Sequence, residues 1–195
     1  MSNEKYATPT RVITGPHTVF SYLHVNEPKM PPDGGTPKYS ASLIIPKDDT
    51  KTVEAIRSAI RAAYAEGENK LKGSNRKAPA LEDIRTPLRD GDKDRPDDEA
   101  YQDAWYMNAS SISKPGIVDR NRDPILDPLE LYSGMIGRAS VTFYAYNVNG
   151  NRGIACGLNN IQKLKDGKPL GGHRRAEDDF AGLDDDDDDE DGFLD

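Results

Sequence analysis

Apolar and polar residues alternate most regularly between Arg138 and Asn147, and a period of two predicts a β-strand. One face of this strand carries small and apolar side chains: Ala139, Val141, Phe143 and Ala145. The other face carries an arginine, two hydroxyl groups and two tyrosines: Arg138, Ser140, Thr142, Tyr144 and Tyr146. The Asn149-Gly150 pair predicts a hairpin turn, so residues 153–164 form the expected partner strand.

Earlier apolar runs predict further strands over residues 11–14, 18–23, 38–45 and 105–113. Between the last two, the period changes to steps of three and four, which predicts a helix over about residues 50–66. Its apolar face is Val53, Ile56, Ile60, Ala63 and Tyr64. Suitable N-cap and exit residues are Asp48, Asp49, Thr50 and Gly67.

These elements predict a mainly β fold of five or six strands with one inserted helix. The leading architecture is an OB-type antiparallel barrel, although the period alone does not separate a barrel from a sandwich. Residues 68–104 are mostly polar and are expected to form a long loop with at most a turn of helix. We expect one domain over residues 1–172 and a disordered acidic tail over 173–195.

Charge divides the chain into two unequal parts. Residues 177–195 hold 12 of the 34 acidic side chains and no lysine or arginine. The remaining 176 residues hold 26 basic and 22 acidic side chains, so the body has a net charge of +4 although the whole chain has −8. A basic body with an anionic tail indicates competition with, or recruitment to, a polyanion.

Other patterns exclude several classes of protein. The single cysteine, Cys156, forms no disulfide within the chain and is expected to be a small core residue. The chain shows no secretory signal and no apolar run of membrane-spanning length, which predicts a cytoplasmic protein without membrane contact. Residues 119–130 place oxygen ligands like a calcium loop, but Pro124 occupies the position that requires glycine. Motifs of nucleotide, hydrolase and zinc sites are absent, so we expect no cofactor, no metal and no catalytic residue.

The polar face of the 138–146 strand is the best candidate for a binding surface. Aromatic rings that stack bases and guanidinium groups that contact phosphates are what single-strand binders use. The candidate DNA-binding residues are Tyr144, Tyr146, Arg138, Tyr106, Lys114, Arg120 and Arg152. The alternative is that the tyrosines pack under a loop and that the basic residues, which lie among aspartates, are ordinary surface charges.

The acidic tail also contains two phenylalanines, Phe180 and Phe193, on either side of the Asp184–Asp189 run. A disordered, solubilising extension needs no aromatic residue, whereas a segment that docks does. Regular negative charge with aromatic rings resembles the chemistry of single-stranded DNA. We therefore expect Phe180, Asp184, Asp189 and Phe193 to act in autoinhibition or partner binding.

Three motifs carry a family resemblance: residues 87–92 (PLRDGD), 114–119 (KPGIVD) and 153–162 (GIACGLNNIQ). Through them the chain, from about Thr8 to Gly172, resembles a family of bacteriophage single-stranded DNA-binding proteins that was first catalogued as a domain of unknown function. The resemblance implies an OB fold and non-catalytic binding of single-stranded DNA. Related phage replication proteins commonly end in an acidic tail with a terminal aromatic residue, whereas here Leu194 and Asp195 follow Phe193.

The expected function is sequence-independent binding and protection of single-stranded DNA in phage replication or recombination. The tail would compete for the DNA groove and recruit replication or recombination proteins. Two alternatives remain open at this stage: a recombination mediator or strand-annealing protein, and a metal-dependent nuclease.

Overall fold

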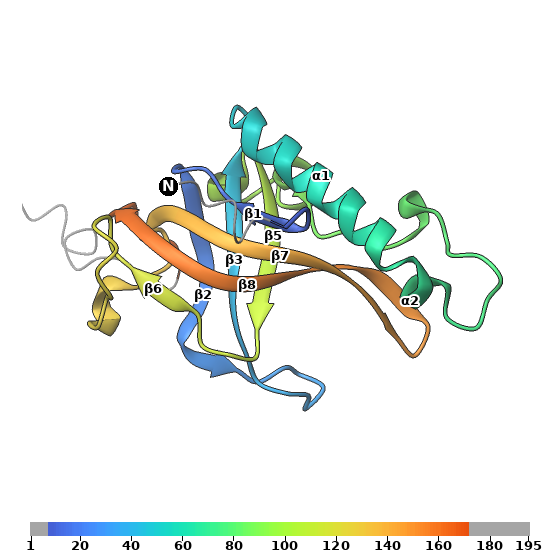
Figure 1. Ribbon diagram of the computed structural model, residues 1–195. Helices are drawn as coiled ribbons and strands as arrows, with labels where there is room; N and C mark the ends of the chain where they lie inside the picture. The colour runs from blue at the N-terminus through green and yellow to red at the C-terminus, as the bar shows by residue number, and fades with distance from the viewer. Residues whose placement is uncertain (1–7, 172–195) are drawn as a thin grey trace, which may run out of the picture.

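The computed structural model describes residues 8–171, which form one long sheet closed on itself and three short-to-medium helices (Figure 1). The strands are β1 (Arg11–Ile13), β2 (Thr18–Lys29), β3 (Lys38–Pro46), β4 (Arg89–Asp90), β5 (Ala104–Ser111), β6 (Gly116–Val118), β7 (Ile136–Val148) and β8 (Asn151–Lys165). The α-helices are α1 (Thr50–Glu66), α2 (Glu68–Lys72) and α3 (Gly91–Asp94). Single 3₁₀ turns are η2 (Leu81–Asp83), η3 (Glu99–Tyr101) and η4 (Pro128–Glu130).

Five strands close the barrel in the order β7-β2-β3-β5-β8, and β8 pairs with β7 along almost their whole length. Strand β1 continues the line of β2 and pairs with the same edge of β7. Four of the five seams are antiparallel, whereas β5 and β8 run parallel where Ser110 pairs with Gly157. The result is a closed five-stranded barrel of the OB type.

The expected OB-type barrel with one main inserted helix is therefore confirmed. The expectation of purely antiparallel pairing is wrong at the β5–β8 seam, because alternation shows which side chains face inward and not which strands become neighbours. The strand count also rises to eight in the described sheet, since the short strands β1, β4 and β6 extend the barrel at its edges. Residues 68–104 are more ordered than a loop, with α2, η2, β4, α3 and η3 along them.

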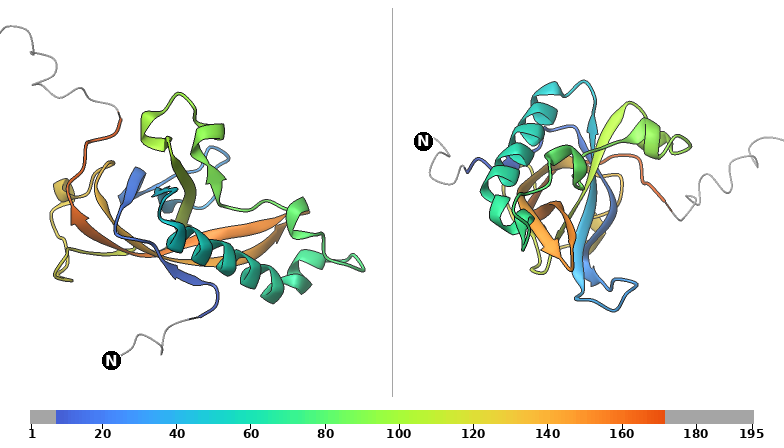
Figure 2. Two further views of the ribbon diagram at one scale, coloured as in Figure 1. Left: turned by 90° about the horizontal axis from the view of Figure 1, so that it is seen from above. Right: turned by 90° about the vertical axis from the view of Figure 1, so that its right-hand side faces the viewer.

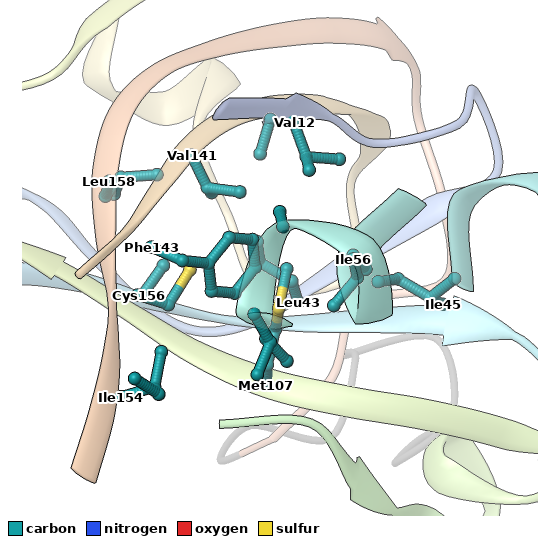
Figure 3. Packing of buried hydrophobic residues seen from close by; sticks show 14 of the residues in the cluster. Val12, Leu43, Ile45, Ile56, Met107, Val141, Phe143, Ile154, Cys156 and Leu158 are labelled. Carbon is teal, nitrogen blue, oxygen red and sulfur yellow. The ribbon is translucent and has the colours of Figure 1, made fainter. Parts of the chain in front are cut away.

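Helix α1 closes one side of the barrel through the face that its period predicted. Val53, Ile56, Ile60 and Ala63 are buried, and Ile56 lies beside Ile45 of β3 in the main core (Figure 3). The Asp49 side chain accepts a hydrogen bond from the Thr52 amide and caps the helix. At the other end of the helix, Gly67 packs closely against Ala145. A Cβ atom at position 67 would lie 2.2 Å from the Ala145 Cβ, so a larger residue would clash.

Residues 89–103 cover a second part of the barrel, on the side away from α1 (Figure 2). Strand β4 pairs with β5 at its edge, and the chain that follows covers the outer side of the sheet near Ile44 and Tyr106. A small cluster forms underneath, made of Ile44, Tyr101, Ala104 and Tyr106. Tyr101 donates to the Ser42 hydroxyl at 3.1 Å and meets the Tyr106 ring edge-on. The outer face of the barrel therefore has a covered half and an open half.

Cys156 is buried in the main core beside Phe143, as expected for a small core residue (Figure 3). Burial raises the pKa of its thiol, so the thiolate is disfavoured.

Candidate nucleic-acid interface

The outer face of the β7–β8 pair is one candidate interface. The side chains that alternation assigned to solvent lie there in register with small or polar residues of β8. The pairs are Arg138–Gln162, Ser140–Asn160, Thr142–Gly157, Tyr144–Ala155 and Tyr146–Gly153. The inward residues Ala139, Val141, Phe143 and Ala145 are all buried, as predicted, and on the opposite face Ser140 is buried as well.

Tyr144 is the exposed aromatic residue of this face. Its Cε1 atom lies 3.5 Å from the position that a Gly157 Cβ would occupy, so the ring crosses β8 where the neighbouring strand has no side chain. The residue remains 46% exposed. Tyr146 is half-buried, and its hydroxyl lies 2.8 Å from the corresponding Cβ position of Gly153. A ring supported from below and open above has the form that base stacking requires.

Arginines surround the other end of the same face. Arg138 donates to the Gln162 side-chain oxygen at 3.0 Å, and Arg11 donates to the Ser140 hydroxyl at 3.2 Å. Arg122 shares with Arg138 a shallow pocket of about 160 Å³ that the exposed Ile13 also lines. Arg120 is exposed next to this pocket, and its carbonyl accepts from Gln162. The face therefore combines one open aromatic ring with four guanidinium groups.

The remaining predicted residues lie elsewhere. Tyr106 is only 5% exposed, and its hydroxyl donates to Asp94 at 3.0 Å, so its ring packs in the small cluster and offers no face to a base. Lys114 is exposed in the β5–β6 loop. Arg152 is half-buried near the hairpin tip. With the Asn75 side-chain oxygen turned toward it, the Arg152 guanidinium donates to that oxygen at 2.9 Å. Phe180, Asp184, Asp189 and Phe193 lie outside the described residues.

A second candidate surface, which the sequence did not indicate, lies on the open half of β2, β3 and β5. In the register, Ser40 lies between His24 and Ser110, and Asn108 is exposed beside them. Ser21 and Ser42, one step along β2 and β3, are buried and lie at the border with the covered half. Burial lowers the pKa of His24, and the charge of Lys29 lowers it further, so this imidazole is neutral at neutral pH. We call this polar area the β2–β3–β5 surface. Tyr22 and Arg95 stand at its border with the 89–103 segment, and Arg95 donates to the Tyr22 hydroxyl at 3.2 Å.

No group of three or more histidine, cysteine or acidic side chains within residues 8–171 could hold a metal ion. The Asp119 carboxylate, first in the calcium-like spacing, accepts from the amides of Asn121 and Asp123 at 2.8 and 3.0 Å. No helix between residues 8 and 171 has the length and apolar character to cross a membrane.

Comparison with known proteins agrees with this architecture. Protein p50 of Acyrthosiphon pisum secondary endosymbiont phage 1 is 31% identical over 160 residues, which are 78% of this chain and 83% of that protein. The solved C-terminal truncation of the single-stranded DNA-binding protein from bacteriophage Enc34 superposes with a TM-score of 0.68 at 23% identity, over 83% of this chain and 88% of that one. The same Enc34 protein in complex with ssDNA gives a TM-score of 0.66 at 26% identity, over 83% and 90%.

A family match covers most of the chain. Residues 10–194 match the family described as the ssDNA-binding protein of Enterobacter phage Enc34. The match includes the barrel, both candidate surfaces and nearly all of the acidic tail. This chain belongs to the Enc34 single-stranded DNA-binding family of phage proteins.

Proposed function

We propose that this protein binds and protects single-stranded DNA without catalysis and with little preference for sequence. Family membership over residues 10–194 is the observation that carries the proposal. A relative of 26% identity and TM-score 0.66 was solved in complex with ssDNA, which supports the same ligand for this barrel. Stacking on tyrosine and contacts with phosphate both tolerate any base, and this tolerance is the physical reason for expecting weak sequence preference.

On the β7–β8 face, the proposed contacts are a base on Tyr144 and phosphates near Arg138 and Arg120. Tyr146, Lys114 and Arg152 are proposed as further contacts at the hairpin and the β5–β6 loop. The basic residues attract the phosphates by charge, so their contribution to the affinity falls as the salt concentration rises. The net charge of +4 on residues 1–176 also attracts the negatively charged DNA strand at long range.

The acidic tail is proposed as a competitor for the same surface. Its 12 carboxylates and two phenylalanines offer the charge and the rings that a DNA strand offers. When DNA displaces the tail, Phe180, Phe193 and the Asp184–Asp189 run become available to replication or recombination proteins. The setting for this exchange would be phage DNA replication or recombination in the host cytoplasm.

The proposal is tested by titrating a fluorescent oligo-dT with the full chain and following anisotropy, with an unlabelled duplex of equal length as competitor. Saturable binding that single strands compete for better than duplex supports the proposal, and no binding at low salt overturns it. Incubating the labelled strand with the protein and Mg²⁺ or Mn²⁺ tests for nuclease activity. Shortened products would show cleavage and would overturn the proposal of a non-catalytic function. Rapid pairing of complementary strands at equal coating density would instead favour an annealing protein.

A further inference from the structure

Tyr22 has an unusual backbone conformation for an aromatic residue. Its φ angle is +45°, in the left-handed region that bulky side chains rarely adopt. Between the Ser21–Ser42 and His24–Ser40 pairs, β2 has one more residue than β3, so Tyr22 lies in a β-bulge. The bulge turns the side chain away from the barrel, and the residue remains 53% exposed. Backbone strain of this kind, here with an aromatic ring exposed to solvent, is often found at binding sites.

Arg95 holds the ring in place from the side of the 89–103 segment. Its guanidinium carbon lies 5.2 Å from the centre of the Tyr22 ring, 4.7 Å from that of Tyr101 and 5.4 Å from that of Tyr106. It also donates to the Tyr22 hydroxyl at 3.2 Å. Tyr101 and Tyr106 are buried, so two of the three rings are fixed and the arginine is anchored by them. Tyr22 is therefore ordered by its neighbours before any ligand arrives.

The surface next to Tyr22 suits a nucleotide chain. Asn108 is exposed, while His24, Ser40 and Ser110 are half-buried, which gives a floor of small or polar groups. At its far end, Lys29 pairs with Lys38 across β2 and β3. Lys114 follows Ser111, which pairs with Tyr39, so a third lysine lies near this end. An aromatic ring beside a polar floor with lysines beyond it provides stacking first and phosphate contacts next.

The 89–103 segment is rich in acidic residues, and several of its carboxylates are already paired. Asp90 and Asp92 bind the Lys47 ammonium at 2.8 and 2.6 Å. Asp94 accepts from Tyr106 at 3.0 Å and faces Arg89 at 3.6 Å. These pairings reduce the repulsion that a phosphate near Tyr22 would otherwise meet, and Arg95 adds a positive charge next to the ring.

We propose that Tyr22 on β2, ordered by the Arg95 guanidinium, is a base-stacking residue for single-stranded DNA. This inference rests on the proposed function. It adds a binding position on strands other than those of Tyr144. The Arg95 role is that of a positioning residue, since its guanidinium acts on the DNA base through the tyrosine ring.

The test compares Tyr22→Leu and Tyr22→Phe in anisotropy titrations with oligo-dT. Leucine keeps an apolar side chain but lacks a π-face, so binding should weaken by about 5- to 150-fold, while phenylalanine should stay within about twofold of the wild type. Tyr64→Leu is the matched control, because Tyr64 lies on α1 and its hydroxyl bonds the Pro79 carbonyl. Thermal unfolding of each variant shows whether the barrel is intact.

A second readout uses the wild-type chain. An oligonucleotide that carries 5-iodouracil should cross-link to Tyr22 under ultraviolet light, and mass spectrometry of the peptide identifies the residue. A folded Tyr22→Leu variant with unchanged affinity, or cross-links that never include residue 22, would overturn the inference alone. A wild-type chain that does not bind the oligonucleotide would overturn the proposed function as well.

Discussion

Replacing Tyr144 by alanine should weaken single-strand binding without unfolding the barrel. The ring crosses β8 above Gly157, and 46% of the residue is exposed. A tyrosine side chain presents roughly 200 Å² of surface, so about 90 Å² is open to a base. At about 25 cal/mol per Å², covering that area is worth about 2 kcal/mol, or about 30-fold in affinity.

The assay is an oligo-dT titration at several salt concentrations, with Tyr144→Phe as the matched control. Stacking involves no ion pair, so Tyr144→Ala should shift the binding curve equally at every salt concentration and leave the salt slope unchanged. Tyr144→Phe keeps the ring and should bind within about twofold of the wild type. If folded Tyr144→Ala binds like the wild type, the β7–β8 face does not stack bases and the interface has been assigned to the wrong strands.

Three further predictions follow from other residues. Arg138→Ala should reduce the slope of log affinity against log salt by about 0.7 if its guanidinium meets one phosphate, and an unchanged slope would remove that contact. Ile56→Ala should lower the free energy of unfolding by about 2–5 kcal/mol in urea titrations because Ile56 is fully buried, whereas exposed Glu54→Ala should change it little; equal effects would contradict the assigned core. Hydrogen bonds from Lys163 and Tyr132 lower the pKa of Asp166, so this carboxylate stabilises the fold above its ordinary pKa of 3.8, and the contribution is lost as pH falls below 3.8 and through the lowered pKa of the folded state. In acid unfolding experiments, Asp166→Asn should show a weaker loss of stability over this range, and an identical profile would count against the ion pair.

Lys163 illustrates how neighbours decide the charge state of a buried amine. Burial by itself would lower its pKa, but hydrogen bonds to Asp166 and Glu130 outweigh that effect and raise it. The ammonium lies 2.8 Å from Asp166 and 2.9 Å from Glu130, at the end of β8 where the chain leaves the barrel. The lysine is therefore a charged structural residue that ties β8 to the turn before β7.

Local sequence patterns predicted those parts of the fold that local forces determine. The helix over residues 50–66 was predicted with its boundaries, because the apolar period, the Asp49 cap and Gly67 all lie within the segment. The inward face of β7 was predicted for the same reason. The parallel β5–β8 seam was not, since it joins strands that are distant in sequence and leaves no mark on their alternation.

The tyrosines show the same limit at the candidate site. Tyr144 and Tyr106 both follow a strand alternation that points them outward, yet only Tyr144 stays exposed. Tyr106 is covered because residues 89–103 return over β5, which no property of its own strand reveals. The sequence did not predict that Tyr22 would be exposed. Its exposure depends on a positive φ angle at a bulge, a conformation that glycine favours and tyrosine rarely adopts.

The most direct test of the account compares the full chain with a chain that lacks Glu177–Asp195, by oligo-dT titration at low and high salt. A basic body with a competing anionic tail predicts that both chains bind single-stranded DNA. Removal of the tail should tighten binding strongly at low salt and much less at high salt, because salt screens the competition. Failure of the shortened chain to bind would contradict the binding role of the barrel, and equal affinities at low salt would contradict the competition by the tail.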